Sequence, residues 1–214
     1  MFNVCPTCGM YEVEREVLAD ADHGFATAIC GSCGARIRFR RRPLYVVTGA
    51  SGAGKTATCH ELTKRQPGFL VLESDILWGV IDVPDEAGID RYWNAWLRVV
   101  RNIHQGPQSV ILCGTLVPEV LDRQPERRYI GETHYLALTA DPNAQERRLR
   151  ARPAWRESSE PAFIEEHLRF NRWLIEHAGA GAPSWALVDT TDQTVSQTAD
   201  AVLAWIAGCH SIVV

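Results

Sequence analysis

The spacing of apolar residues changes near residue 43. From there on, short apolar runs of strand length alternate with longer segments that are apolar on one side only. The apolar runs lie at 44–48, 69–73, 109–114, 133–139 and 185–189, and the amphipathic segments at 54–66, 88–105, 141–152, 160–178 and 193–207. Strands that alternate with helices predict an α/β fold with a parallel sheet. Nearly continuous apolar strands predict that helices cover both faces of that sheet.

The first 42 residues follow a different pattern. They contain two pairs of cysteines, short β-like runs at 10–18, 26–30 and 36–40, and few large apolar side chains. A boundary at Arg42–Pro43 therefore divides the chain into a small module, residues 1–42, and a main α/β domain, residues 43–214.

Composition and charge exclude some classes of function. The 214 residues carry a net charge of −4, so the chain lacks a general basic field for nucleic acid, and the run at 36–43 is a local exception. No apolar stretch is long enough to predict a transmembrane helix. The first ten residues lack the basic and apolar regions of a secretory signal. We expect a cytoplasmic protein without membrane contacts.

The segment "GASGAGKT", residues 49–56, lies between a predicted strand and a predicted helix. In this pattern, backbone N–H groups and the positive end of the helix cradle phosphate oxygens, the lysine reaches the β- and γ-phosphates, and the threonine hydroxyl binds Mg²⁺. A glycine-rich turn without a ligand is the alternative, but the strand–loop–helix setting favours a nucleoside triphosphate. With ATP as the expected ligand and Thr56 as the Mg²⁺ ligand, the predicted nucleotide-binding residues are Gly49, Ala50, Ser51, Gly52, Ala53, Gly54, Lys55, Thr56 and Ala57.

Two carboxylates follow the second strand of the main domain. Glu73 and Asp75 are expected at the carboxyl edge of the sheet, where ligands of open α/β sheets bind. There they would lie beside residues 49–56, which we call the phosphate loop. Phosphoryl transfer to an alcohol needs a carboxylate that orients the hydroxyl and accepts its proton. We predict this role for Asp75, and a role in binding substrate or the Mg²⁺ water shell for Glu73. Capping of a helix by Ser74 or Asp75 is the alternative.

The third strand ends without an acidic residue. Motor-type and switch-type ATPases hold Mg²⁺ through an aspartate at that point, so its absence from "SVILCGT" counts against those classes.

Five arginines lie within ten residues, at positions 147, 148, 150, 152 and 156. Arg148 and Arg152 are four residues apart and share one face of a helix that Pro153 should end. We predict a lid around 141–158 whose guanidinium groups, above all those of Arg148 and Arg152, stabilise charge on the transferred phosphoryl group. A solvated helix face with ion pairs to neighbouring glutamates is the alternative.

Two more residues are interpreted from their neighbours. Trp78 closely follows the two acids, where it is suited either to stacking on an aromatic or sugar-like acceptor or to core packing. Asp192, in the loop after the last strand, is interpreted as the N-cap of the final helix.

Taken together, "GASGAGKT", "ESD", "ILCGT", "RRLRARPAWR" and "VDTTD" resemble the P-loop kinases of small metabolites and nucleotides, which include gluconate, shikimate, nucleoside-monophosphate and chloramphenicol phosphotransferases. The resemblance covers residues 44–207. It implies a three-layer α/β/α P-loop NTPase fold with five parallel strands in the order 2-3-1-4-5. It also implies use of ATP and Mg²⁺, with the strand-two aspartate, here Asp75, as general base. No monophosphate-binding signature is present, and residues 78–103 form a substrate-side segment of their own.

The cysteines of the first module have metal-binding spacing. Cys5 and Cys8, in "CPTCG", and Cys30 and Cys33, in "CGSCG", enclose 21 residues. Four thiolates in two such turns suit tetrahedral Zn²⁺, so the module looks like a zinc ribbon. Redox dithiols and disulfides are the alternatives. The arginine-rich run at 36–43 is interpreted as a half-exposed strand, with nucleic-acid contact as the alternative.

These features predict an ATP-dependent kinase acting on a hydroxyl or phosphate group of a small nucleoside-, nucleotide- or sugar-like molecule. Lys55, Asp75, Arg148 and Arg152 are its predicted catalytic residues, and Glu73, Asp75 and Trp78 its predicted acceptor-binding residues. The first alternative is a polynucleotide end-kinase or ATPase that docks RNA or DNA through the zinc ribbon. The second is a nucleotide-binding regulator without transfer chemistry. The acids and arginines favour the kinase over the regulator, and the negative net charge favours it over the nucleic-acid enzyme.

Overall fold

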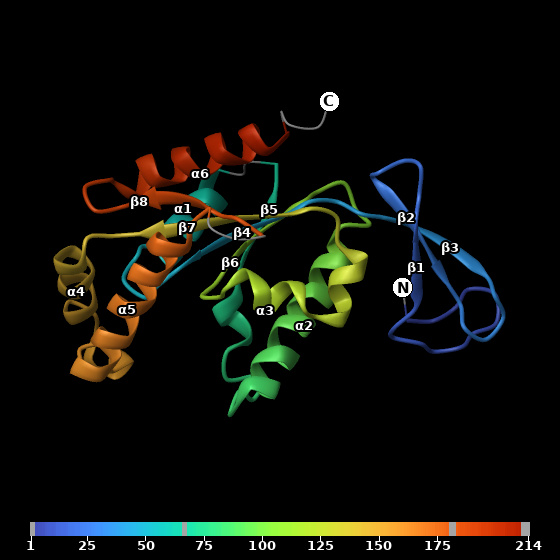
Figure 1. Cartoon of the computed structure of the whole chain (residues 1–214), viewed down its shortest axis with the longest axis horizontal. Helices are drawn as coiled ribbons and strands as arrows, with labels where there is room; N and C mark the ends of the chain where they lie inside the picture. Colours follow the sequence, from blue (N-terminus) through green and yellow to red (C-terminus); the bar gives the residue numbers. More distant parts are fainter. Residues whose placement is uncertain (1–2, 66–67, 180–182, 211–214) are drawn as a thin grey trace. The chain divides into compact units, whose positions relative to one another are not determined.

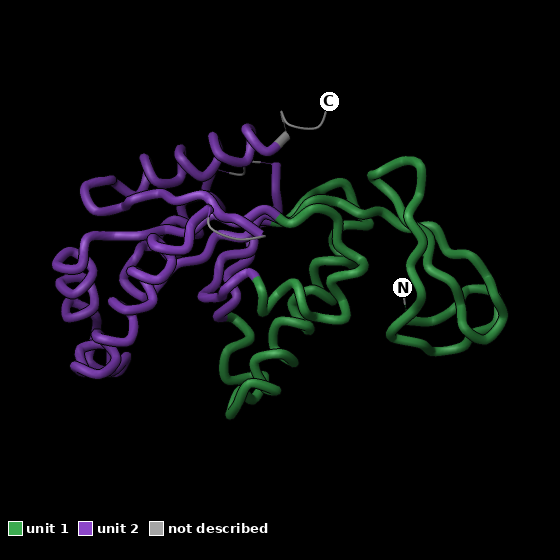
Figure 2. Tube along the Cα trace, viewed as in Figure 1, with its two compact units in different colours: residues 1–44, 76–110, 119–133 green, residues 45–75, 111–118, 134–214 purple. Residues whose placement is uncertain are grey.

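The structure, a computed structural model, describes residues 3–65, 68–179 and 183–210. Their contacts divide the chain into two compact units, coloured separately in Figure 2. The first unit comprises residues 1–44, 76–110 and 119–133, and the second comprises residues 45–75, 111–118 and 134–214.

The second unit is built on a five-stranded parallel sheet (Figure 1). Its strands are β4 (Leu44–Gly49), β5 (Leu70–Glu73), β6 (Val110–Cys113), β7 (Thr133–Thr139) and β8 (Ala186–Asp189). Their order in the sheet is β5-β6-β4-β7-β8. Counted from β4, this is 2-3-1-4-5, so the predicted α/β class and strand order are confirmed.

Helices cover the sheet of this unit on both sides. They are α1 (Lys55–Arg65), α4 (Pro142–Arg150), α5 (Pro161–His177) and α6 (Val195–His210), and a short 3-10 turn, η3 (Ala154–Arg156), follows α4. Alternate strand residues such as Tyr45 and Val47 form a core with Leu62 of α1 and Val202 of α6. Val46, which points to the opposite face, is equally buried. Figure 1 shows α5 across the sheet from α6, which completes the three layers.

The first unit contains a small antiparallel sheet and the segment that follows Asp75. Its strands, β1 (Glu16–Ala19), β2 (Phe25–Ile29) and β3 (Arg36–Arg40), pair in chain order. Its helical elements are η1 (Ser74–Leu77), which begins at the unit boundary, the long α2 (Glu86–Ile103), α3 (Pro118–Asp122) and η2 (Pro125–Tyr129). No helix among the described residues has the length and apolarity needed to cross a membrane.

The β-like run predicted at 10–18 forms a strand only from Glu16 onward. Its first part belongs to the turn around the first cysteine pair, where the N–H of Cys5 donates to the carbonyl of Met10 over 2.9 Å. The chain turns back on itself there, and Tyr11 forms only an isolated antiparallel bridge with Val4, so the prediction was too long.

The predicted cap of the final helix was wrong. Thr194 caps α6, because its hydroxyl accepts the N–H of Gln197 over 3.2 Å while the Gln197 side chain accepts the N–H of Thr194 over 2.8 Å. This reciprocal pair is a capping box, and it leaves Asp192 two residues too early to cap the helix.

Candidate active site

The loop between β4 and α1, predicted to bind phosphate, depends on glycine at both of its ends. Gly49 has a φ of 149°, and a Cβ there would lie 2.5 Å from the carbonyl oxygen of Leu138. Gly54 has a φ of 97°, and a Cβ there would have no atom within 4 Å, so the chain beside it faces open space. The loop therefore needs glycine for close packing at one end and for its left-handed backbone at the other.

The side chain of Lys55 lies folded over this loop. Its ammonium donates to the carbonyl of Gly49 over 2.7 Å and to that of Ala50 over 3.1 Å. Burial lowers the pKa of Lys55, the charge of Asp75 opposes this shift and the charge of Arg152 adds to it, with a net pKa of about 8. A desolvated ammonium of this kind gains from an anionic partner.

A pocket of about 400 Å³ opens beside the loop. Its lining residues are Gly52, Gly54, Lys55, Thr56, Ala57, His60, Arg148, Arg152 and Arg156. Four of the lining residues are lysine or arginine, and none of the lining side chains carries a carboxylate. A concave site at a helix N-terminus with this charge is suited to a polyphosphate.

The two acids predicted from the sequence act electrostatically on this cluster. Glu73 ends β5, and Asp75 is exposed in η1. The charge of Asp75 raises the pKa values of both Lys55 and Arg152, and that of Glu73 raises the pKa of Lys55, against the larger effect of burial. These acids therefore lie within electrostatic reach of the pocket's cations. The hydroxyl of Thr115, just after β6, donates to the carbonyl of Gly49 over 3.3 Å, so the side chain that contacts the loop from this strand end is neutral.

Four of the five arginines in the cluster fall into three groups, and the fifth, Arg147, is exposed. Arg150 pairs with Glu146 on the surface of α4 at 2.7 Å. Arg148 donates to the carbonyl of Gly52 over 3.3 Å, and to the hydroxyl and carbonyl of Thr190 over 3.0 and 2.7 Å. Arg152 and Arg156 lie beyond the end of α4 and line the pocket.

The last two guanidinium groups are crowded. Burial lowers the pKa of Arg152, and the charge of Arg156 lowers it further. Because arginine stays protonated in proteins, the cost remains as repulsion between two cations. A bound anion between them would relieve that repulsion.

Sequence reasoning missed two histidines that belong to this site. His60 lines the pocket, and its Nε2 lies 4.0 Å from a Glu73 carboxylate oxygen. It is four residues after Thr56 on α1, and this i, i+4 spacing was a readable signal. His167 of α5 accepts the N–H of Ser51 at Nδ1 over 3.4 Å. Burial and the charge of Lys55 lower its pKa, so it accepts as a neutral ring. No local pattern linked it to the loop.

Trp78 lies in the first unit, where it contacts Tyr92 of α2 edge-on with ring centroids 5.7 Å apart. It is 64% exposed, and its neighbours Ile76 and Val80 are exposed as well. The tryptophan is therefore a surface side chain rather than a core residue.

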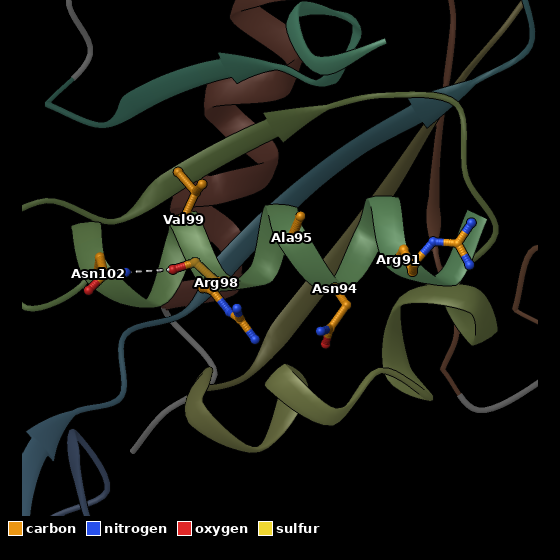
Figure 3. Close-up of a pocket in the computed structure, with 6 residues that line it drawn as sticks. All are labelled: Arg91, Asn94, Ala95, Arg98, Val99 and Asn102. Atoms are coloured by element: carbon orange, nitrogen blue, oxygen red, sulfur yellow. Dashed lines mark hydrogen bonds between the residues drawn. The ribbon is translucent and has the colours of Figure 1, made fainter. Parts of the chain in front are cut away.

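A second concavity, of about 490 Å³, lies along α2 (Figure 3). Three of its four polar side chains have structural partners, and the fourth is Arg91. Arg98 pairs with Glu126 at 2.9 Å, Asn94 accepts the N–H of Glu126 over 3.1 Å, and Asn102 donates to the carbonyl of Arg98 over 2.9 Å. No set of unengaged catalytic groups converges among its lining residues, so the pocket beside the phosphate loop is the candidate active site.

The four predicted metal-binding cysteines come together in the first unit. All four sulfur atoms lie within 4.8 Å of one another, with Cys5 and Cys33 at 3.8 Å and Cys8 and Cys30 at 3.8 Å. These distances are far longer than a disulfide bond of about 2.05 Å. The group can hold a metal ion.

Comparison with known proteins supports the fold. No protein-family model matches the chain, and no curated protein matches it significantly. Among solved structures, the chain is similar to a sugar kinase from Janibacter sp. at 17% identity and a TM-score of 0.54, covering 78% of this chain and 95% of that one. It is similar to a tunicamycin resistance protein from Deinococcus radiodurans at 21% identity and a TM-score of 0.55, covering 78% and 96%. It is also similar to a gluconokinase from Sinorhizobium meliloti at 18% identity and a TM-score of 0.54, covering 79% and 95%.

Proposed function

We propose that the protein is an ATP-dependent phosphotransferase that acts on a small hydroxyl- or phosphate-bearing molecule. The observation that carries this proposal is the pocket beside the phosphate loop, which Lys55, Arg152 and Arg156 line and in which Lys55 and Arg152 are under the electrostatic influence of Asp75. A site that only stored nucleotide would need the cations but not a nearby exposed carboxylate.

ATP would bind with its phosphates against the loop amides and the Lys55 ammonium. Thr56, which lines the pocket, would hold Mg²⁺, and that ion would neutralise phosphate charge. The open space beside Gly54 and the absence of carboxylates from the described pocket lining fit a polyanion.

Asp75 is assigned as the general base. The acceptor oxygen forms a bond to the γ-phosphorus, the bond from that phosphorus to the β–γ bridging oxygen breaks, ADP leaves with that electron pair, and the acceptor proton passes to the Asp75 carboxylate. Arg152 and Arg156 would stabilise charge on the transferred group. Arg148, which is engaged with Gly52 and Thr190, would act by holding the loop after β8 against the phosphate loop.

The similar structures support transfer chemistry in general terms. A sugar kinase and a gluconokinase have this fold, and an APS kinase from Mycobacterium tuberculosis with the same fold was solved with AMPPNP and APS. That structure has a TM-score of 0.53 and 15% identity, covering 78% of this chain and 98% of that one.

The acceptor is assigned a partly apolar or aromatic face. Trp78 is exposed and follows Asp75 by three residues. Three residues of extended chain span at most roughly 11 Å, so the tryptophan is tethered close to the proposed base. Its ring is suited to stacking on a nucleoside base or a sugar face.

Zn²⁺ is the metal assigned to the four cysteines. Four sulfurs about 2.3 Å from a central Zn²⁺ form a tetrahedron with edges of about 3.8 Å. The two sulfur pairs measured at 3.8 Å agree with that edge.

The nucleic-acid alternative has less support. Most arginines of the run at 36–43 have partners in the first unit. Arg38 pairs with Asp20 at 2.8 Å, Arg41 donates to the carbonyl of Ile130, and Arg42 donates to that of Gly106. Side chains engaged in this way are poorly placed to neutralise phosphates.

A coupled assay of ADP release tests the proposal. The protein, ATP and Mg²⁺ would be incubated with nucleosides, nucleotides, sugars and aminoglycoside-like compounds in turn. We expect release that saturates with one class of small acceptor, and mass spectrometry should find that acceptor heavier by one phosphoryl group. ADP release unaffected by any acceptor would contradict transfer. Stimulation only by RNA or DNA ends, with a salt-dependent gel shift, would favour the alternative.

Binding of ATP is expected to weaken as the pH rises above about 8. Because the pKa of Lys55 is lowered to about 8, the free protein loses its ammonium charge there and must regain a proton to bind the phosphates. The Kd for an ATP analogue with Mg²⁺ should be nearly constant below about pH 7 and rise by up to roughly tenfold per pH unit above about pH 8.

The matched control is Lys55→Arg, whose guanidinium does not titrate in this range. Its Kd is expected to be higher but to lack the rise above about pH 8, and any pH dependence that remains in its curve belongs to the nucleotide itself. A wild-type curve parallel to that of the variant would show that Lys55 does not titrate near pH 8.

A further inference from the structure

The cysteine module does not complete its own core. Ala26, Ala28 and Phe39 of its sheet cluster with Tyr129, which comes from η2 and lies about ninety residues further along the chain. The Phe39 and Tyr129 rings meet edge to face with centroids 5.7 Å apart. A sheet of this size buries too little apolar surface to be stable alone, so it depends on η2 and on its metal.

The hydroxyl of Tyr129 also joins the module to η2. It accepts the N–H of Arg15 over 2.8 Å and donates to the carbonyl of Val13 over 3.0 Å. Because this buried hydroxyl both donates and accepts, it fixes the backbone of Val13 and Arg15 relative to Tyr129.

A buried ionic cluster forms a second connection. Arg101 of α2 and Glu126 of η2 are 1% and 2% exposed, and they pair at 2.8 Å. Arg101 also donates to the side-chain oxygen of Asn3, two residues before Cys5. Its guanidinium carbon lies 4.6 Å from the centre of the Tyr129 ring. Removal of one member would leave a buried charge without its partner.

Glu12 links both cysteine turns to this cluster. Its carboxylate accepts the N–H of Gly31, next to Cys30, over 3.0 Å and lies 3.7 Å from Nε of the buried Arg15. Its own N–H donates to the carbonyl of Asn3 over 2.7 Å. The second cysteine turn is therefore linked to Arg15 through the Glu12 side chain. The first cysteine turn is linked to Arg101 through Asn3, two residues before Cys5.

We infer that the ion held by the four cysteines braces α2 and η2. The metal fixes the two cysteine turns, the turns fix Asn3 and Glu12, and these hold Arg101, Arg15 and thereby Tyr129 in place. The brace extends to Trp78, which rests on Tyr92 of α2. Its consequence for an acceptor rests on the proposed function, but the brace itself does not.

Hydrogen exchange on the full-length protein tests the brace. Elemental analysis of the purified protein is expected to find one zinc per chain. After removal of zinc by a chelator, peptides from α2 and η2 should exchange roughly tenfold faster or more, while peptides from α1 and α6 keep their rates. Re-addition of Zn²⁺ should restore protection. Absence of zinc, unchanged exchange in α2 and η2, or an equal increase in α1 and α6 would each overturn the inference.

Variants separate the brace from metal binding itself. Glu12→Ala leaves all four cysteines and should retain one zinc per chain while exchange in α2 and η2 becomes faster. Glu14→Ala, two residues further on, removes an exposed carboxylate that pairs only at the surface with Arg128, and it should behave as wild type. Equal exchange in the two variants would overturn the route through Glu12.

Nucleotide binding provides a readout that does not depend on catalysis. An ATP analogue should bind the zinc-depleted protein with its Kd changed less than about twofold, because the phosphate site belongs to the second unit. If an acceptor is identified, its KM should rise on zinc removal while the KM for ATP does not. Failure to find an acceptor would count against the proposed function, whereas unchanged exchange would count against the brace.

Discussion

Replacement of Lys55 by alanine is expected to lower kcat about 10³-fold or more. The Lys55 ammonium lies over the phosphate loop, 2.7 Å from the carbonyl of Gly49, and is partly desolvated. In the proposed reaction it interacts with the phosphates, where charge accumulates during transfer. Alanine would leave the loop intact but remove the one lysine that lines the described pocket. Steady-state ADP release with a saturating acceptor measures the effect.

Lys64→Ala is the matched control for this variant. Lys64 is exposed at the other end of the same helix, and the same loss of charge there should leave kcat unchanged. Equal melting temperatures would show that both variants are folded. Wild-type turnover by Lys55→Ala would refute the assigned role and the phosphate site with it.

Replacement of Asp75 by asparagine is expected to lower kcat by about 10²–10⁴ with little change in the KM for either substrate. Asparagine has the shape of aspartate but cannot accept the acceptor's proton. The substitution also separates the two interpretations of this residue. Asparagine and aspartate cap helices about equally well, so a purely structural cap would leave kcat nearly unaffected.

Glu119→Gln is a suitable control, because it neutralises an exposed carboxylate on α3 by a change of the same kind. Its kinetic constants should match those of the wild type. A loss in Asp75→Asn that is confined to the KM of the acceptor would reassign Asp75 to acceptor binding. A full loss of nucleotide affinity would show that the substitution had disturbed the phosphate loop instead.

Much of the site could be predicted because its signals are local. Three glycines, a lysine and a threonine at fixed spacing determine a turn between one strand and one helix, and Gly49, Gly52 and Gly54 all have positive φ. The Cys-x-x-Cys pairs are local in the same way. Each brings two thiols together in one turn, and only the meeting of the two turns required the fold.

The contacts of the arginines could not be predicted from their spacing in the sequence. The four-residue interval between Arg148 and Arg152 indicated a shared helix face, but α4 ends at Arg150 and Arg152 lies beyond it. Arg148 finds its partner in Thr190, which is 42 residues away in sequence. Helical periodicity predicts the direction in which a side chain points, but it does not predict which group from a distant segment that side chain will contact.

Taken alone, the sequence determined the class of fold, the order of its strands through a family resemblance, the phosphate loop and the four thiols. The class of fold, the loop and the thiols follow from hydrophobic periodicity or from residues a few positions apart, whereas the strand order follows only from the resemblance. Only the tertiary structure decided that His167 contacts the loop, that Tyr129 completes the core of the cysteine module and that Arg101 and Glu126 form a buried pair. These contacts join segments distant along the chain, and they form because burial requires partners for polar groups wherever folding brings them.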